Sequence, residues 1–242
     1  MTARLFVGIA LRPDAEIALP PGATRHAQVR RVQPGDTLCL FDGLGCDWPA
    51  TVLSVGRSSV NVRVGLPLAV HNELSASVTV ALGMPANERM DALVEKATEL
   101  GVANIQPLLT ERSVLRLAGE RAERKRAHWQ AMAEAACEQC GRARVPRVLP
   151  VCALAEWLPQ APAGQRLVLS LQADAQPLSA AAPATATAQH ITTLSGPEGG
   201  LSADEENAAR QHGFVPVALG PRVLRADTAP LAVLAWMGLR EH

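Results

Sequence analysis

The stretch SGPEGGLSADE, Ser195–Glu205, follows the apolar run HITTL and precedes a polar segment with helix-forming residues. Glycines crowded at the end of a strand allow the backbone to come close to a ligand. Ser202 and Glu205 have the spacing of a capping box, which predicts that a helix begins here. Backbone N–H groups at a helix start favour acceptor atoms, whereas a tight turn without a ligand would have the same pattern.

A second stretch, LGPRVLRADTAPLAV from Leu219, repeats this arrangement further along the chain. An apolar strand ends at Leu219-Gly220, and Asp227 is a candidate cap for the helix that follows. In open α/β sheets, ligands bind outside the carboxyl ends of the strands. Two such turns at the same ends of successive strands therefore predict a binding site.

The rest of the chain divides into two patterns. From Val78 onward, short apolar runs alternate with amphipathic segments such as NERMDALVEKATELG, which predicts an α/β domain with a parallel sheet. Residues 1–70 have alternating runs and closely spaced turns, which predicts a small all-β domain. Residues 172–189 have low complexity and predict a surface loop.

Composition excludes several classes of protein. The chain has 242 residues, is 48% hydrophobic and carries no formal net charge, so no overall charge draws it to nucleic acid or membrane. Its apolar runs are shorter than the ~20 residues of a membrane span, and we expect a cytoplasmic protein without disulfides. Cys137 and Cys140 form a C-x-x-C without further ligands at a suitable spacing, so we expect no metal.

Further stretches agree with one known family. They are EKATELGVANIQPLLTERSV (Glu95–Val114), EQCGRARVP (Glu138–Pro146), RLFV (Arg4–Val7) and VRRVQPGDTLCLFDG (Val29–Gly43). With the two glycine-containing stretches, they make the whole chain resemble the RsmE family of bacterial 16S rRNA uridine-N3 methyltransferases, which belongs to the SPOUT superfamily.

The resemblance implies an α/β fold with a SPOUT-type domain containing a deep trefoil knot at residues 75–242. It also implies a PUA-like β-barrel that binds RNA at residues 1–70, a homodimer, and 16S rRNA of the small ribosomal subunit as substrate. S-adenosyl-L-methionine would be the methyl donor. The carried-over donor-binding residues are Leu171, Gln172, Leu194, Gly196, Pro197, Gly199, Gly200, Leu219, Gly220, Val223, Leu224 and Thr228.

Methyl transfer to uracil N3 defines the chemistry that the site must supply. The base must be unpaired, its N3 proton must leave, and the developing anion must be stabilised. Arg225 is the candidate cation, and Glu198 and Asp227 are candidate proton acceptors. The alternative for Glu198 is a charge at a helix N-terminus, and for Asp227 a helix cap.

Five arginines are candidates for binding RNA: Arg4, Arg30, Arg31, Arg112 and Arg142. The alternative for Arg112 and Arg142 is a salt bridge to a nearby glutamate.

Two other functions are compatible with the sequence. A SPOUT methyltransferase could act on another rRNA or tRNA site, such as a ribose 2′-oxygen, or the chain could be a non-catalytic RNA-binding module.

Overall fold

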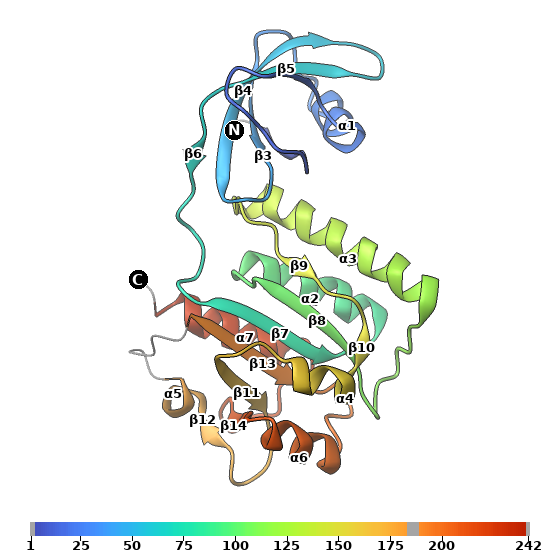
Figure 1. The fold of residues 1–242 in the computed structure, drawn as a ribbon, viewed down its shortest axis with the longest axis vertical. Coiled ribbons are helices and arrows are strands. Elements are labelled where there is room, and N and C mark those ends of the chain that lie inside the picture. The colour runs from blue at the N-terminus through green and yellow to red at the C-terminus, as the bar shows by residue number, and fades with distance from the viewer. Residues whose placement is uncertain (1–2, 183–188, 241–242) are drawn as a thin grey trace. The chain divides into compact units, whose positions relative to one another are not determined.

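The computed structural model describes residues 3–182 and 189–240, which divide into two compact units. One unit comprises the chain up to Glu73 together with Glu134–Val145. The other comprises Leu74–Ala133 and the chain from Pro146 onward. Figure 1 shows the elements of each. Within the described ranges, none of the helices has both the length and the hydropathy needed to cross a membrane.

The first unit is built on one mainly antiparallel sheet. Its strands are β1 (Arg4–Phe6), β2 (Glu16–Ala18), β3 (Thr37–Phe41), β4 (Cys46–Val55), β5 (Val60–Val64) and β6 (Leu68–Ala69). They lie in the order β1-β3-β4-β5-β2, with β6 beside β4. Alternate residues of the strands face a core that includes Leu40, Val52 and Val62.

A helix, α1 (Pro21–Val29), interrupts this unit, so the expectation of an all-β segment was wrong. Pro21 fits the first turn, where a missing N–H costs little. Ala23, Thr24 and Ala27 form the buried side of the helix, and the Thr24 hydroxyl donates to the Leu19 carbonyl at 2.8 Å. Because this side is made of small residues, the segment lacks the large apolar periodicity by which a helix is recognised.

The second unit is built on a parallel sheet. Its strands are β7 (Ser77–Gly83), β8 (Asn104–Leu109), β9 (Arg147–Val148), β10 (Cys152–Ala153), β11 (Gln165–Leu169), β12 (Gln176–Pro177), β13 (His190–Ser195) and β14 (Val215–Ala218). Their order is β10-β8-β7-β13-β11-β14-β12, with β9 also beside β8. The pairings run parallel, which confirms the predicted α/β domain.

Helices cover both faces of this sheet. They are α2 (Asn87–Glu99), α3 (Gly119–Cys140), α4 (Leu154–Trp157), a 3-10 turn (Leu158–Gln160), α5 (Leu178–Ala181), α6 (Ala203–Gln211) and α7 (Thr228–Gly238). Leu82 of the sheet shares a core with Met90 of α2 and Val233 of α7. Ala81, which points to the other face, shares a core with Trp157 of α4. This is a three-layer α/β/α arrangement.

The low-complexity stretch 172–189 is more ordered than the predicted surface loop. It contributes β12, which pairs with β14, and the short helix α5. Leu178 and Ala182 pack into the core that Leu82 belongs to, so the prediction was wrong for 176–182. Two apolar contacts within an alanine-rich stretch leave no periodic signal. Residues 183–188 of the same prediction lie outside the described residues.

Three neighbouring strands bring the predicted loops together. β11 lies between β13 and β14 and runs parallel to both, so the carboxyl ends of all three strands meet at one edge. The segments that leave this edge begin at Ser170, Gly196 and Leu219. The prediction of two turns at the same ends of their strands is therefore confirmed.

Candidate active site

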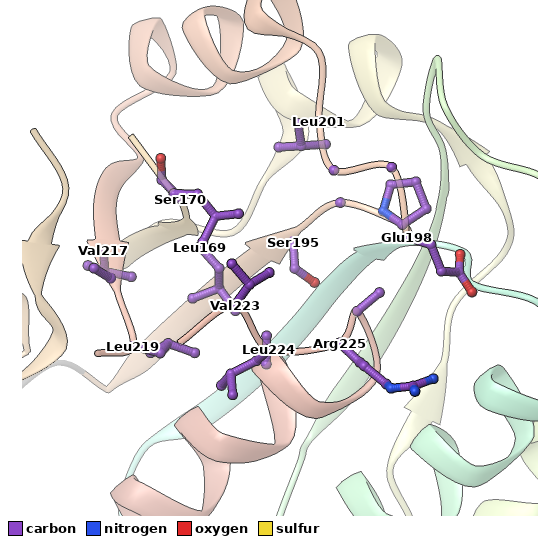
Figure 2. Close-up of a pocket in the computed structure, with 18 of the residues that line it drawn as sticks. Leu169, Ser170, Ser195, Glu198, Leu201, Val217, Leu219, Val223, Leu224 and Arg225 are labelled. Carbon is purple, nitrogen blue, oxygen red and sulfur yellow. The ribbon is translucent and has the colours of Figure 1, made fainter. Parts of the chain in front are cut away.

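A cavity of about 750 Å³ opens at this edge of the sheet. Its size lies within the range of small-molecule sites. Figure 2 shows apolar side chains, among them Leu219, Val223 and Leu224, gathered on one side of it. The side chains of Glu198 and Arg225 both extend toward the right of that view, away from Leu219.

Ten of the twelve predicted donor-binding residues line this cavity. They are Leu171, Gln172, Gly196, Pro197, Gly199, Gly200, Leu219, Gly220, Val223 and Leu224. The lining does not include Leu194 or Thr228. Leu194 is fully buried in the core under α4, and Thr228 is the first residue of α7. Leu194 directly precedes the lining residue Ser195, and Thr228 directly precedes the lining residue Ala229.

The segment Ser195–Leu201, called the 195–201 loop from here on, forms one wall. A Cβ added to Gly196 would lie 2.4 Å from the carbonyl carbon of Gly200, so the two ends of the loop touch through their backbones. The loop then enters α6 through the predicted capping box. Ser202 Oγ accepts from the Glu205 amide, and the Glu205 carboxylate accepts from the Ser202 amide.

Glu198 is held at the start of α2. Its Oε1 accepts from the Ala86 amide at 3.1 Å and from Arg89 Nη1 at 3.0 Å. Partial burial raises the pKa of Glu198, but these hydrogen bonds, its own amide and the Arg89 charge outweigh burial and hold the pKa below its usual value. The carboxylate is therefore ionised and already paired at neutral pH.

Arg112 lines the cavity and holds the 195–201 loop from a different direction. Its Nη1 donates to the carbonyl of Gly199 at 2.8 Å and to that of Leu201 at 3.3 Å. The neighbouring Glu111 amide donates to Glu205 Oε1 at 2.8 Å, which ties the same segment to the start of α6. The predicted alternative for Arg112 was a salt bridge to a nearby glutamate, whereas its hydrogen-bond partners in the described structure are these backbone carbonyls.

Arg225 and Asp227 lie in the turn before α7. Arg225 lines the cavity with an exposed side chain, and within the described residues its guanidinium has no ion pair or hydrogen bond. Asp227 occupies the position before the helix but makes no side-chain cap bond, so it is not a hydrogen-bonding cap. Its Oδ1 is buried without a hydrogen-bond partner in this part of the structure.

Sequence reasoning assigned no role to three polar groups of this cavity. Ser195 is 4% exposed, and its Oγ has no hydrogen-bond partner in the described structure. Ser170 Oγ donates to Glu206 Oε1 at 2.7 Å, and Arg210 Nη2 donates to the same oxygen at 2.8 Å. Ser195 and Ser170 could have been found, because each ends or directly follows a strand. Glu206 carries no such signal, since it lies within a helix.

The remaining predicted arginines lie in the first unit. Arg4 pairs with Asp47 at 2.7 Å, donates to the carbonyls of Cys137 and Arg142, and lies 3.9 Å from the Phe41 ring centroid. Arg142 is 4% exposed and pairs with Glu73, as its alternative predicted. Arg30 and Arg31 are exposed at the end of α1, without an ion pair in the described chain.

Known proteins match both units. A family model described as an RNA methyltransferase domain matches residues 72–238, and one described as an RNA methyltransferase PUA domain matches residues 19–65. The ribosomal RNA small subunit methyltransferase E of Mycobacterium bovis is 32% identical over 244 residues, which cover 99% of this chain and 92% of that protein. Its counterpart from Synechocystis sp. is 31% identical over 238 residues, covering 97% and 77%.

A solved structure gives the same result. It is a ribosomal RNA small subunit methyltransferase E from Neisseria gonorrhoeae bound to S-adenosyl methionine, with a TM-score of 0.91 and 34% identity. The match covers 98% of this chain and 97% of that chain. The family resemblance that the motifs predicted is therefore confirmed. The chain belongs to the ribosomal RNA small subunit methyltransferase E family, with an RNA methyltransferase domain and a PUA domain.

Proposed function

We propose that this protein transfers a methyl group from S-adenosyl-L-methionine to N3 of a specific uridine in 16S rRNA of the small ribosomal subunit. One observation carries the proposal. A cavity lined by three loops lies at the carboxyl ends of adjacent parallel strands, in a chain that matches a methyltransferase bound to S-adenosyl methionine over nearly its whole length.

The residues of the cavity fit the methyl donor. Apolar side chains at Leu219, Val223 and Leu224 offer contact area for the adenine and the aliphatic chain. The unpaired Ser195 Oγ is a buried polar group in need of a partner, and a ligand in the cavity can supply one. Glu206 adds a carboxylate suited to hydroxyl or ammonium groups. When bound, the donor supplies an electrophilic methyl group on its sulfonium.

Arg225 and Asp227 are the proposed catalytic groups. The free guanidinium of Arg225 can stabilise the negative charge that develops on the uracil as the N3 proton leaves. We propose Asp227 as the acceptor of that proton, because its Oδ1 has no hydrogen-bond partner within the described chain. Asp227 is not among the lining residues and its Oδ1 is buried, so this role requires the turn before α7 to open when the RNA binds. Glu198 suits this role less well, since a paired carboxylate with a lowered pKa is a weak base.

We propose that residues 1–70 bind the RNA and that residues 75–242 carry out the transfer. Arg30 and Arg31 are the proposed phosphate contacts of the first domain, and their freedom from carboxylates supports this role. Arg31 has a φ of +56°, an unfavourable backbone conformation for a residue with a side chain. We propose that Arg4 and Arg142, which are paired internally, organise that domain.

We further propose that the protein is a homodimer. From Thr228 to Gly238, α7 has no charged residue, and Leu231, Ala232, Ala235 and Trp236 along it stay partly exposed. Such a face favours burial against a second copy. Light scattering should give a mass twice that of the monomer, and the Trp236→Glu variant should give a mass closer to that of the monomer.

Two finer features follow from family membership rather than from the cavity. We propose that the 195–201 loop and the segment Leu219–Thr228 belong to a deep trefoil knot. We also propose that the PUA-like sheet closes as a barrel. A ribosomal substrate supports a cytoplasmic location.

The proposal is tested with small subunits from a strain that lacks this modification. Purified protein and labelled S-adenosyl-L-methionine are added, and reverse transcription maps the product, because N3-methyluridine blocks pairing. Label with a single stop at one uridine supports the proposal. Label without a stop favours ribose 2′-O methylation or another target. Binding of the donor without label on subunits, naked rRNA or tRNA favours a non-catalytic RNA-binding module.

A further inference from the structure

We infer that Arg89 is a positioning residue for the methyl donor, and that it acts by anchoring Glu198 and thereby fixing the shape of the 195–201 loop. The inference rests on the proposed location of the donor in the cavity that this loop lines. It gives Glu198 a role as an anchor, in place of the predicted role as a proton acceptor.

The anchor joins the middle of the loop to the first turn of α2. Glu198 lies halfway along the loop, and one of its oxygens receives both the Ala86 amide at 3.1 Å and Arg89 Nη1 at 3.0 Å. The Ala86 amide is one of the unsatisfied N–H groups at the start of a helix, which suits a carboxylate. Within the described residues, the Arg89 side chain makes no other hydrogen bond or ion pair. The side chain also lines the cavity.

Two further contacts hold the same loop, so that its position is fixed from three sides. Arg112 binds the carbonyls of Gly199 and Leu201. Pro197 rests on Gly83 at the end of β7, where an added Cβ would lie 2.5 Å from the proline Cδ. The Glu198 anchor lies between these two contacts in the sequence. Without it, the middle of the loop would be held only by the flanking contacts at Pro197 and Gly199.

The exposure of the pair argues for a geometric role. The Arg89 and Glu198 side chains are 36% and 29% exposed, and ion pairs at this level add little to global stability. A loop that is already in its binding conformation, however, loses less freedom when the ligand binds. Removing Arg89 should therefore raise the Kd for the donor while leaving the melting temperature nearly unchanged.

The experiment compares Arg89→Ala, Arg89→Lys, Glu198→Ala and the double variant Arg89→Ala/Glu198→Ala. Arg126→Ala is the matched control. Arg126 is 35% exposed, pairs with Glu123 at 2.9 Å on α3 and does not line the cavity. Equilibrium dialysis with labelled S-adenosyl-L-methionine gives Kd, turnover on small subunits gives kcat, and thermal unfolding gives Tm.

Arg89→Ala should raise Kd about fivefold, as for loss of one half-exposed charge-assisted hydrogen bond, and change kcat at saturating donor by less than about twofold. Lysine at position 89 should restore Kd to within about twofold, because a single Nη1 bond is involved. In the Glu198→Ala background, which removes the acceptor oxygen, adding Arg89→Ala should change Kd by less than about twofold. Arg126→Ala should leave Kd unchanged while shifting Tm as much as Arg89→Ala.

The inference is overturned if Arg89→Ala lowers kcat with Kd unchanged, if the two single effects multiply in the double variant, or if Arg126→Ala raises Kd equally. Gly196→Ala separates this failure from failure of the proposed site. If Gly196→Ala weakens donor binding and Arg89→Ala does not, the site stands and the anchor is wrong. If neither change affects Kd, the donor does not bind against this loop.

Discussion

Replacing Gly196 by alanine tests whether the 195–201 loop must keep its present shape. An added Cβ would lie 2.4 Å from both the Gly200 carbonyl carbon and the Leu201 nitrogen, whereas ordinary contact begins at 3.4 Å. The two ends of the loop must therefore separate by about 1 Å (3.4 − 2.4), because both neighbours are backbone atoms. Misplacement of this size in a binding site has large kinetic consequences.

Overpacking of this kind costs about 1–3 kcal/mol, and if that cost falls on the binding conformation it raises Kd for S-adenosyl-L-methionine roughly 5- to 150-fold. Equilibrium dialysis with labelled donor measures Kd, and circular dichroism checks that the fold persists. Gly22→Ala is the control, because an added Cβ on Gly22 meets no atom within 4 Å. A folded Gly196→Ala protein with a Kd within twofold of wild type would refute the reasoning.

Three further predictions concern single side chains. Arg225→Ala should lower kcat on small subunits about 10²- to 10³-fold while Kd for the donor changes less than about threefold, and an unchanged single-turnover rate would contradict its catalytic role. Arg31→Gly should relieve the backbone strain at a φ of +56° and leave the protein no less stable to urea. The same change should raise KM for the small subunit, and an unchanged KM would show that Arg31 does not contact the RNA. The pKa of Glu198 is lowered, so its stabilising contribution is complete above the ordinary value of 4.5 and is lost as the pH falls through the folded value. In urea unfolding, the difference in stability between wild type and Glu198→Gln should accordingly be constant near neutral pH and shrink in acid. A difference that grew in acid would contradict a lowered pKa for Glu198.

Most of the cavity wall was predictable because its residues are local to the ends of strands. The run HITTL predicts β13, the glycines after it predict a close turn, and Ser202 with Glu205 predicts α6. These signals lie within a few residues of one another. Hydrogen-bond geometry and chain stiffness act over the same short range, so the sequence pattern and the structure agree.

Contacts between distant segments were not predictable from residue patterns. Arg89 and Glu198 are 109 positions apart, and an arginine in the first turn of a helix has no feature that marks a partner. Arg142 was predicted as an RNA contact with an ion pair as the alternative, and charge alone could not decide between them. Its 4% exposure beside Glu73 depends on how the chain after α3 packs.

Small residues caused the two errors in the fold. α1 buries alanines and a threonine, and the chain around α5 buries Leu178 and Ala182 within a low-complexity stretch. Both segments are ordered by packing against neighbours, and their own periodicity is weak. Tertiary contacts therefore determine the structure of these segments, because their local sequence pattern gives no clear signal.

The most direct test of the account is the identity of the methylated nucleoside. Small subunits that lack the modification are treated with the protein and S-adenosyl-L-methionine, and their 16S rRNA is digested to nucleosides and analysed by mass spectrometry beside standards. The account predicts N3-methyluridine at about one per subunit, lost with Arg225→Ala. A 2′-O-methylated nucleoside, or no methylated product from a protein that binds the donor, would contradict it.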